Sequence, residues 1–162
     1  MNSIRDKIWY FLADSKANEI LSGLIVKKYQ RRELFLSIFL ALATSSSVGA
    51  WAFWNKFPSV WLVIIAISQF LFVVKPYLLF SKYVKIFNEK SVHWQHLTVQ
   101  IEELWHNINH NYVNEKEASK LYFELKQKTL SFNNVPDDII FFKHKKQQNE
   151  AELECNVYLT KI

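Results

Sequence analysis

Two long apolar stretches occupy the middle of the chain and dominate its pattern. The first, Leu34–Trp54, carries no charged side chain, and the second, Val60–Phe80, carries only Lys75 near its end. A stretch of this length is about 31 Å long as an α-helix, which is enough to cross the hydrocarbon core of a bilayer. The short segment Asn55–Ser59 can join two antiparallel helices but cannot cross the membrane again. The pattern therefore predicts a two-span transmembrane helical hairpin.

Charged residues gather on the two flanks of this hairpin. Eighteen of the twenty Lys and Arg and all fifteen Asp and Glu lie outside residues 34–80, and the joining segment offers only Lys56. Because basic residues next to membrane spans stay on the cytoplasmic side, we expect both termini in the cytoplasm. The residues that orient the hairpin in this way are Lys27, Lys28, Arg31, Arg32, Lys82 and Lys85.

The N-terminal flank, residues 1–33, is predicted to be a cytoplasmic amphipathic helical segment. Apolar residues such as Ile4, Ile8 and Leu12 recur at helical spacing, with Lys and Arg on other faces. Asp14-Ser15 is a candidate break, with Ser15 capping a second helix. The apolar stripe either packs against the other cytoplasmic helices or lies on the inner leaflet of the membrane.

The C-terminal flank, residues 81–162, is predicted to be a cytoplasmic helical domain. Apolar residues at seven-residue spacing indicate a long, coiled-coil-like helix with a seam for partner helices, although Lys90 and Asn111 interrupt it. Asn114 is expected to cap a further helix, with Glu117 at the capping-box position. The seam consists of Phe87, Trp94, Leu97, Ile101, Leu104, Trp105 and Ile108.

The segment after that helix is expected to start with a break at Asn133–Pro136. A short helix around Ile139–Phe142 and a frayed or helical tail are expected to follow. With two Gly and three Pro in the chain, the whole pattern favours long helices. The fold class is therefore an all-α membrane protein.

Polar residues inside the spans are candidates for helix contacts. Four consecutive residues of the first span, Thr44 to Ser47, place hydroxyls on all sides of the predicted helix. The four include Ser45, Ser46 and Ser47. Gln69 lies near the middle of the second span. An unpaired amide is costly in lipid, so Gln69 favours assembly with another helix or another copy of the chain. The hydroxyls either mediate close helix packing or line a pore in an oligomer. Pro58 suits the first turn of the second helix, and Pro76 is expected to bend its end.

Catalytic chemistry finds little support in the sequence. With glycine only at positions 23 and 49, a glycine-rich phosphate loop is impossible, and there is no nucleophile elbow. His93, His96, His106 and His110 have helical spacing but no catalytic arrangement around them. We predict no enzyme activity, no cofactor and no metal site. The net charge of +5 is explained by the membrane flanks, so no sequence-specific contact with nucleic acid is predicted.

The hairpin at 34–80, the basic flanks at Lys27–Arg32 and Lys82–Lys90, and the helical extension together resemble a known group over Ile20–Asn134. This group is the two-transmembrane effectors of bacterial anti-phage systems, including SLATT-type effectors and the membrane effectors of some retrons. The resemblance implies a toxin that a partner keeps silent and that self-associates to permeabilise the inner membrane on infection. The partner would be a cytosolic regulatory protein or a nucleoprotein complex. Alternatives are a membrane anchor or scaffold subunit that recruits a cytosolic partner, and a small channel or transporter subunit.

Overall fold

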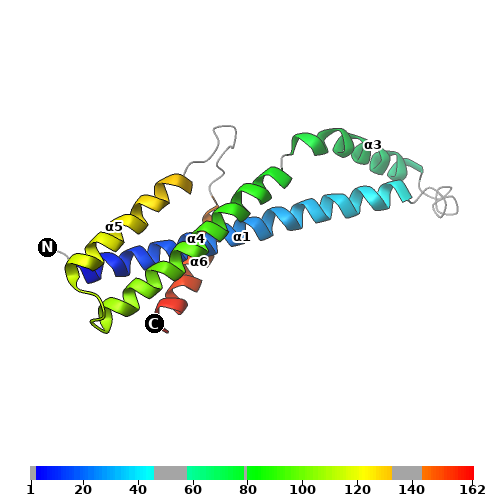
Figure 1. Cartoon of the computed structure of the whole chain (residues 1–162). Coiled ribbons are helices and arrows are strands. Elements are labelled where there is room, and N and C mark those ends of the chain that lie inside the picture. Colours follow the sequence, from blue (N-terminus) through cyan, green and yellow to red (C-terminus); the bar gives the residue numbers. More distant parts are fainter. Residues whose placement is uncertain (1–2, 46–57, 79, 133–143) are drawn as a thin grey trace. The chain divides into compact units, whose positions relative to one another are not determined.

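Every element that the structure describes is a helix, which confirms the all-α prediction (Figure 1). The structure is a computed structural model that describes residues 3–45, 58–78, 80–132 and 144–162. The elements are α1 (Ile4–Ser45), α3 (Pro58–Val74), a 3₁₀ turn η1 (Lys75–Tyr77), α4 (Phe80–Asn109), α5 (Glu115–Phe132) and α6 (Lys145–Leu159). The predicted short helix at Ile139–Phe142 lies outside the described residues.

The chain divides into two compact units. Unit 1 comprises Met1–Val26 and Lys85–Ile162, and unit 2 comprises Lys27–Val84. Helices α1 and α4 each contribute residues to both units. The three predicted domains, 1–33, 34–80 and 81–162, stay a prediction.

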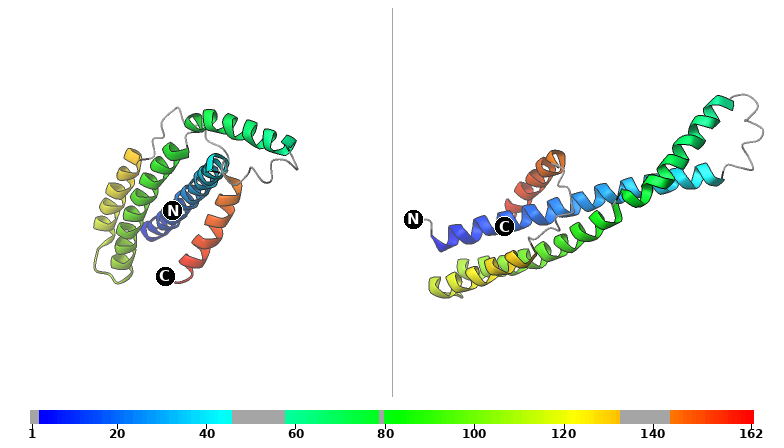
Figure 2. Two further views of the ribbon diagram at one scale, coloured as in Figure 1. Left: turned by 90° about the vertical axis from the view of Figure 1, so that its right-hand side faces the viewer. Right: turned by 90° about the horizontal axis from the view of Figure 1, so that it is seen from above.

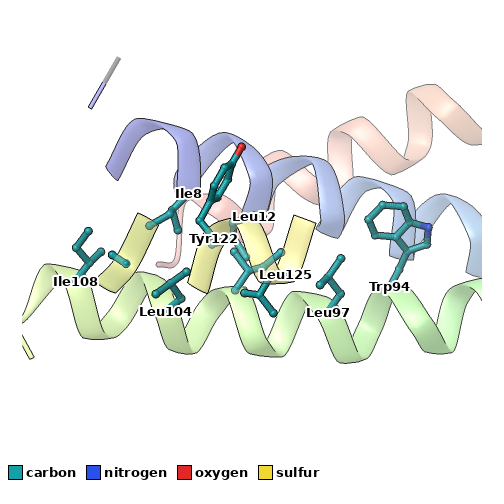
Figure 3. Packing of buried hydrophobic residues seen from close by; sticks show 10 residues of the cluster. Ile8, Leu12, Trp94, Leu97, Leu104, Ile108, Tyr122 and Leu125 are labelled. Atoms are coloured by element: carbon teal, nitrogen blue, oxygen red, sulfur yellow. The ribbon is translucent and has the colours of Figure 1, made fainter. Parts of the chain in front are cut away.

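Unit 1 is built around one apolar core in which α1, α4 and α5 meet (Figure 3). Ile8 and Leu12 of α1 have no exposed surface. They pack with residues of α4 and α5, so the N-terminal stripe takes the first of its two predicted alternatives and contacts other helices of the chain. The core cluster contains Ile8, Leu12, Trp94, Leu97, Ile101, Leu104, Ile108, Ala118, Tyr122 and Leu125.

Helix α6 covers another side of α1. It lies opposite α4 and α5 across α1 in both views of Figure 2. The Cys155 thiol donates to the Ala13 carbonyl at 3.4 Å, and the Lys16 ammonium lies 4.5 Å from the centre of the Tyr158 ring. The tail predicted to be frayed or helical is therefore a helix with its own contacts in unit 1.

The predicted break at Asp14-Ser15 is wrong, because α1 runs through both residues without interruption. Ser15 is fully buried inside unit 1, and Asn18 donates its side-chain amide to the Asp14 carbonyl at 2.9 Å. Burial of the neighbouring turns outweighs the weak local preference of Asp and Ser for a helix start. The helix instead begins at a reciprocal cap, in which the Asp6 N–H donates to Ser3 Oγ and the Ser3 N–H donates to Asp6 Oδ2.

The connection between α4 and α5 follows the sequence signals closely. Asn111 has a positive φ of 57°, and the Tyr112 N–H donates to the Asn107 carbonyl at 2.9 Å, which is the Schellman pattern of a helix end. Asn111 thus ends α4 rather than interrupting a longer seam. At the start of α5 the Glu117 N–H donates to Asn114 Oδ1 at 2.9 Å, which confirms the predicted cap.

The second predicted span departs from one straight helix. It begins at Pro58 as expected, but α3 ends at Val74, and Lys75–Tyr77 forms a 3₁₀ turn before α4 begins at Phe80. Pro76 has no N–H to donate to the Phe72 carbonyl, and its ring clashes with a continuing helix, so the α-helix ends there. Only Leu34–Ser45 of the first predicted span belongs to the described residues.

By length and composition, no single helix in the described part of the chain would cross a membrane. One bent pair of segments, Leu62–Tyr77 and Phe80–Asn109, has the length and apolar composition of a membrane span when the two are taken together.

We expect Ile101→Ala to destabilise unit 1 by about 2–5 kcal/mol, because it leaves a cavity at the centre of the core. Ile101 has no exposed surface, whereas Val99 on the same helix is 58% exposed. Val99→Ala should therefore change the free energy of unfolding by about 0.5 kcal/mol or less. Urea titration followed by helical circular dichroism measures both. Equal losses in the two variants would contradict the core described above.

Candidate functional site

The most unusual feature of unit 2 is the apolar surface of α3. A water-soluble helix normally shields its large apolar side chains along one stripe. Among the described side chains of α3, the shielded ones are Ile64, Ser68, Leu71 and Val74, at the helical spacing i, i+4, i+7 and i+10. Large apolar residues on the other sides are exposed, namely Val60, Leu62, Val63, Ile65, Ile67, Phe70, Phe72 and Val73.

The end of α1 continues this pattern. Tyr29, Leu36 and Leu40 form its buried stripe, and the neighbouring large residues Leu34, Phe35, Ile38 and Leu42 are exposed. Phe35 is 74% exposed. We call these residues, together with the exposed apolar residues of α3, the apolar surface. Exposed apolar residues in such number are typical of surfaces that contact another protein or a membrane.

Polar contacts connect the elements of unit 2 next to the apolar surface. The Lys75 ammonium donates to Ser37 Oγ at 3.3 Å, and Ser81 Oγ donates to the Glu33 carboxylate at 2.6 Å. These bonds join α1 to η1 and α1 to α4. Lys75 lies near the end of the second predicted span.

The basic flank before the first predicted span is partly packed into unit 2. The Tyr29 and Tyr83 rings stack, with centres 4.7 Å apart and planes at 10°. Burial raises the pKa of Tyr29, and Tyr83 adds to this rise while Arg32 opposes it. Burial lowers the pKa of Lys28, and the charge of Arg32 lowers it further. Lys27, Arg31 and Arg32 are exposed, Lys28 and Lys82 are half-buried, and Lys85, in unit 1, is exposed.

The polar residues predicted to make helix contacts are only partly described. Gln69 is exposed on α3, outside the shielded stripe of Ile64, Ser68, Leu71 and Val74. Its amide therefore lies among side chains of the apolar surface. Ser45 is the last residue of α1, while Ser46 and Ser47 lie outside the described residues. The structure places Ser68, which sequence reasoning had not singled out, in the shielded stripe, where its hydroxyl donates to the Ile65 carbonyl at 2.9 Å.

The predicted partner seam lies within unit 1. Phe87, Trp94, Leu97, Ile101, Leu104 and Ile108 are all buried, and all but Phe87 belong to the core cluster that they form with α1 and α5. Phe87 meets His144 edge to face, with ring centres 6.5 Å apart. Trp105 is partly buried, and its ring lies 5.1 Å from that of Trp9. Helices of the same chain thus occupy the surface predicted for a partner.

The histidines of α4 form no metal-binding group in the described residues, where no cluster of three or more His, Cys, Asp or Glu could hold a metal. The His106 and His110 rings lie 4.1 Å apart, and Tyr112 stacks on His110. Cys155 is a buried thiol. Burial raises its pKa, an effect that the nearby Lys16 opposes and Asp14 reinforces.

Comparison with protein-family models, with curated proteins and with solved structures finds no match to this chain.

We expect Cys155 to react slowly with iodoacetamide at neutral pH in the native chain, because the thiol is buried and its raised pKa leaves little thiolate. In denaturant the rate should rise to that of a free cysteine. A matched control moves the thiol by one residue to the exposed position Asn156, with Cys155→Ala and Asn156→Cys combined, and should react rapidly without denaturant. Equal rates for the native chain and this control would show that α6 is not packed against α1.

Proposed function

We propose that this chain is a protein of the bacterial inner membrane in which the helices of unit 2 insert as a two-span hairpin. The observation that carries the proposal is the apolar surface. Burying a large apolar side chain is worth about 1.5–3 kcal/mol relative to leaving it in water. A surface of this extent therefore strongly favours a non-aqueous environment, and lipid supplies one on every side of α3.

The proposed orientation places both termini and unit 1 in the cytoplasm. Lys27, Lys28, Arg31 and Arg32 precede the first span, and Lys82 and Lys85 follow the second. Basic residues in such positions favour the cytoplasmic side. Unit 1 fits this arrangement, because it buries its own apolar core between helices that carry most of the charged residues of the chain.

Within the membrane, Gln69 supports self-association. Its amide is exposed on the apolar surface, where lipid offers it no hydrogen-bond partner. A second copy of the chain can supply that partner through its own Gln69, and a symmetric oligomer repeats the contact in each subunit. One hairpin encloses no lumen, so permeabilisation by helices requires several copies.

We infer from these features that the chain acts as a membrane-permeabilising effector of the two-transmembrane anti-phage type. The hairpin, its basic flanks and the helical cytoplasmic unit support this inference. In the proposed mechanism a cytosolic regulatory component keeps the chain inactive and releases it on infection, and the oligomer then disrupts the inner membrane. The alternative of a passive anchor that recruits a partner through the α4 seam is less well supported, because the chain's own helices cover that seam.

We expect expression of the chain without its regulatory component to depolarise bacterial cells and slow their growth. Gln69→Leu should weaken both effects and reduce detergent-stable oligomer, because an interhelical bond of this kind contributes about 0.6–2 kcal/mol, or roughly 3- to 30-fold per contact. Membrane insertion should remain intact. A potential-sensitive dye, growth curves and crosslinking measure these outcomes.

The matched control is Gln95→Leu, which replaces an exposed glutamine of α4 in unit 1 and should behave like the parent chain. Normal growth with an intact membrane potential, at confirmed membrane levels of the parent, would overturn the effector proposal and favour an anchor. If Gln69→Leu assembles and depolarises cells like the parent, Gln69 has no part in the mechanism.

A further inference from the structure

Unit 2 contains a cavity where α1, α3, η1 and the start of α4 come together. Its volume is about 570 Å³, which lies in the range of small-molecule sites. The walls combine two kinds of chemistry. Leu36, Phe72 and Phe80 form an apolar part, and Glu33, Lys75 and Lys82 bring charged groups to the same cavity.

The charged part of the cavity favours an anion. The lining contains two lysines and one glutamate, which gives it a formal charge of +1. An ammonium has three N–H donors, so the bond from Lys75 to Ser37 leaves it able to donate to a further acceptor. The Glu33 carboxylate already accepts a hydrogen bond from Ser81, and a carboxylate can accept further bonds from hydroxyl groups of a ligand.

The apolar part of the cavity favours hydrocarbon. Phe72 is 65% exposed and belongs both to the cavity wall and to the apolar surface, so the cavity is continuous with the face that we place in lipid. A free phosphate or a sugar phosphate would satisfy the lysines and leave Leu36, Phe72 and Phe80 without a partner. A molecule with an anionic head and an acyl chain matches both parts.

We propose that this cavity binds an anionic phospholipid, with phosphatidylglycerol as the type of ligand. The phosphate group would lie between Lys75 and Lys82, the glycerol hydroxyls would donate to Glu33, and an acyl chain would lie along Leu36, Phe72 and Phe80. Basic pockets between membrane helices on the cytoplasmic side bind anionic headgroups in this manner. The inference rests on the proposed membrane insertion, in which Lys75 and Lys82 lie at the inner leaflet.

The test uses the full chain in a non-ionic detergent and measures lipid adducts by native mass spectrometry. The probes are dioleoyl-phosphatidylglycerol and dioleoyl-phosphatidylcholine, which share their acyl chains and differ in the headgroup. The parent should bind phosphatidylglycerol at least fivefold more tightly. Lys75→Gln and Lys82→Gln should each weaken that binding roughly fivefold without affecting phosphatidylcholine, and Lys75→Arg should restore it.

The control Lys116→Gln removes an exposed lysine at the start of α5 and should leave the preference unchanged. Glycerol 3-phosphate, which has the phosphate group but no acyl chain, should not compete. Equal binding of the two lipids by the parent, or loss of the preference in Lys116→Gln, would overturn the proposal. Full competition by glycerol 3-phosphate would also overturn it, because the occupant would then be a free phosphate compound.

Membrane extraction separates this inference from the function on which it rests. If alkaline carbonate extracts the parent chain from membranes, the proposed insertion fails. If the chain resists extraction but binds both lipids equally, only the lipid site fails. Circular dichroism of the glutamine variants checks that they retain the helix content of the parent.

Discussion

Among the described side chains of α3, large apolar ones are exposed outside the stripe of Ile64, Ser68, Leu71 and Val74, and water is a poor solvent for such a helix. One neighbouring helix can cover only one face of another, so the remaining faces of α3 need a different environment. The proposed membrane insertion agrees with the charge pattern of unit 2, in which only Lys56 and Lys75 are charged between residues 34 and 80, while basic residues lie near its two ends. An exposed amide such as that of Gln69 is ordinary in water but costly in lipid, so the proposed insertion requires a hydrogen-bond partner for it.

Unit 1 also consists of helices, but it buries its large apolar side chains within the chain. Its helices are amphipathic, and their apolar stripes close on one another around Ile8, Ile101 and Leu125. Helix α1 contributes to both units, and the character of its surface changes along its length. In unit 1 the apolar stripe of α1 contacts α4 and α5. From Leu34 onward, more of the large apolar residues of α1 are exposed than buried.

Local signals in the sequence predicted the helices well. The cap at Asn114 and the start of α3 at Pro58 depend on hydrogen bonds and backbone preferences of a few adjacent residues, which a sequence displays directly. The seven-residue spacing from Phe87 to Ile108 correctly identified the buried face of α4. Spacing reveals that a face is buried but not what covers it, so the seam was predicted to bind a partner although α1 and α5 lie on it.

Features that depend on distant parts of the chain were not predictable in this way. Helix α1 passes through Asp14-Ser15 because tertiary packing buries Ser15, and no local pattern announces this. The position of α6 depends on its contact with Ala13, which is far away in sequence. The cavity combines Glu33, Lys75 and Lys82 from three elements, and only the fold brings them together. Residues 46–57, which contain Ser46 and Ser47, lie outside the described chain, so their predicted role stays a prediction.

Unit 2 is proposed to insert in the membrane as a hairpin with both termini in the cytoplasm. Reporter fusions test it most directly, with alkaline phosphatase, which is active in the periplasm, and green fluorescent protein, which fluoresces in the cytoplasm. We expect phosphatase activity for a fusion after Lys56, and fluorescence without phosphatase activity for fusions after Arg32 and Ile162. A periplasmic reporter at Ile162, or a cytoplasmic one at Lys56, would contradict the hairpin.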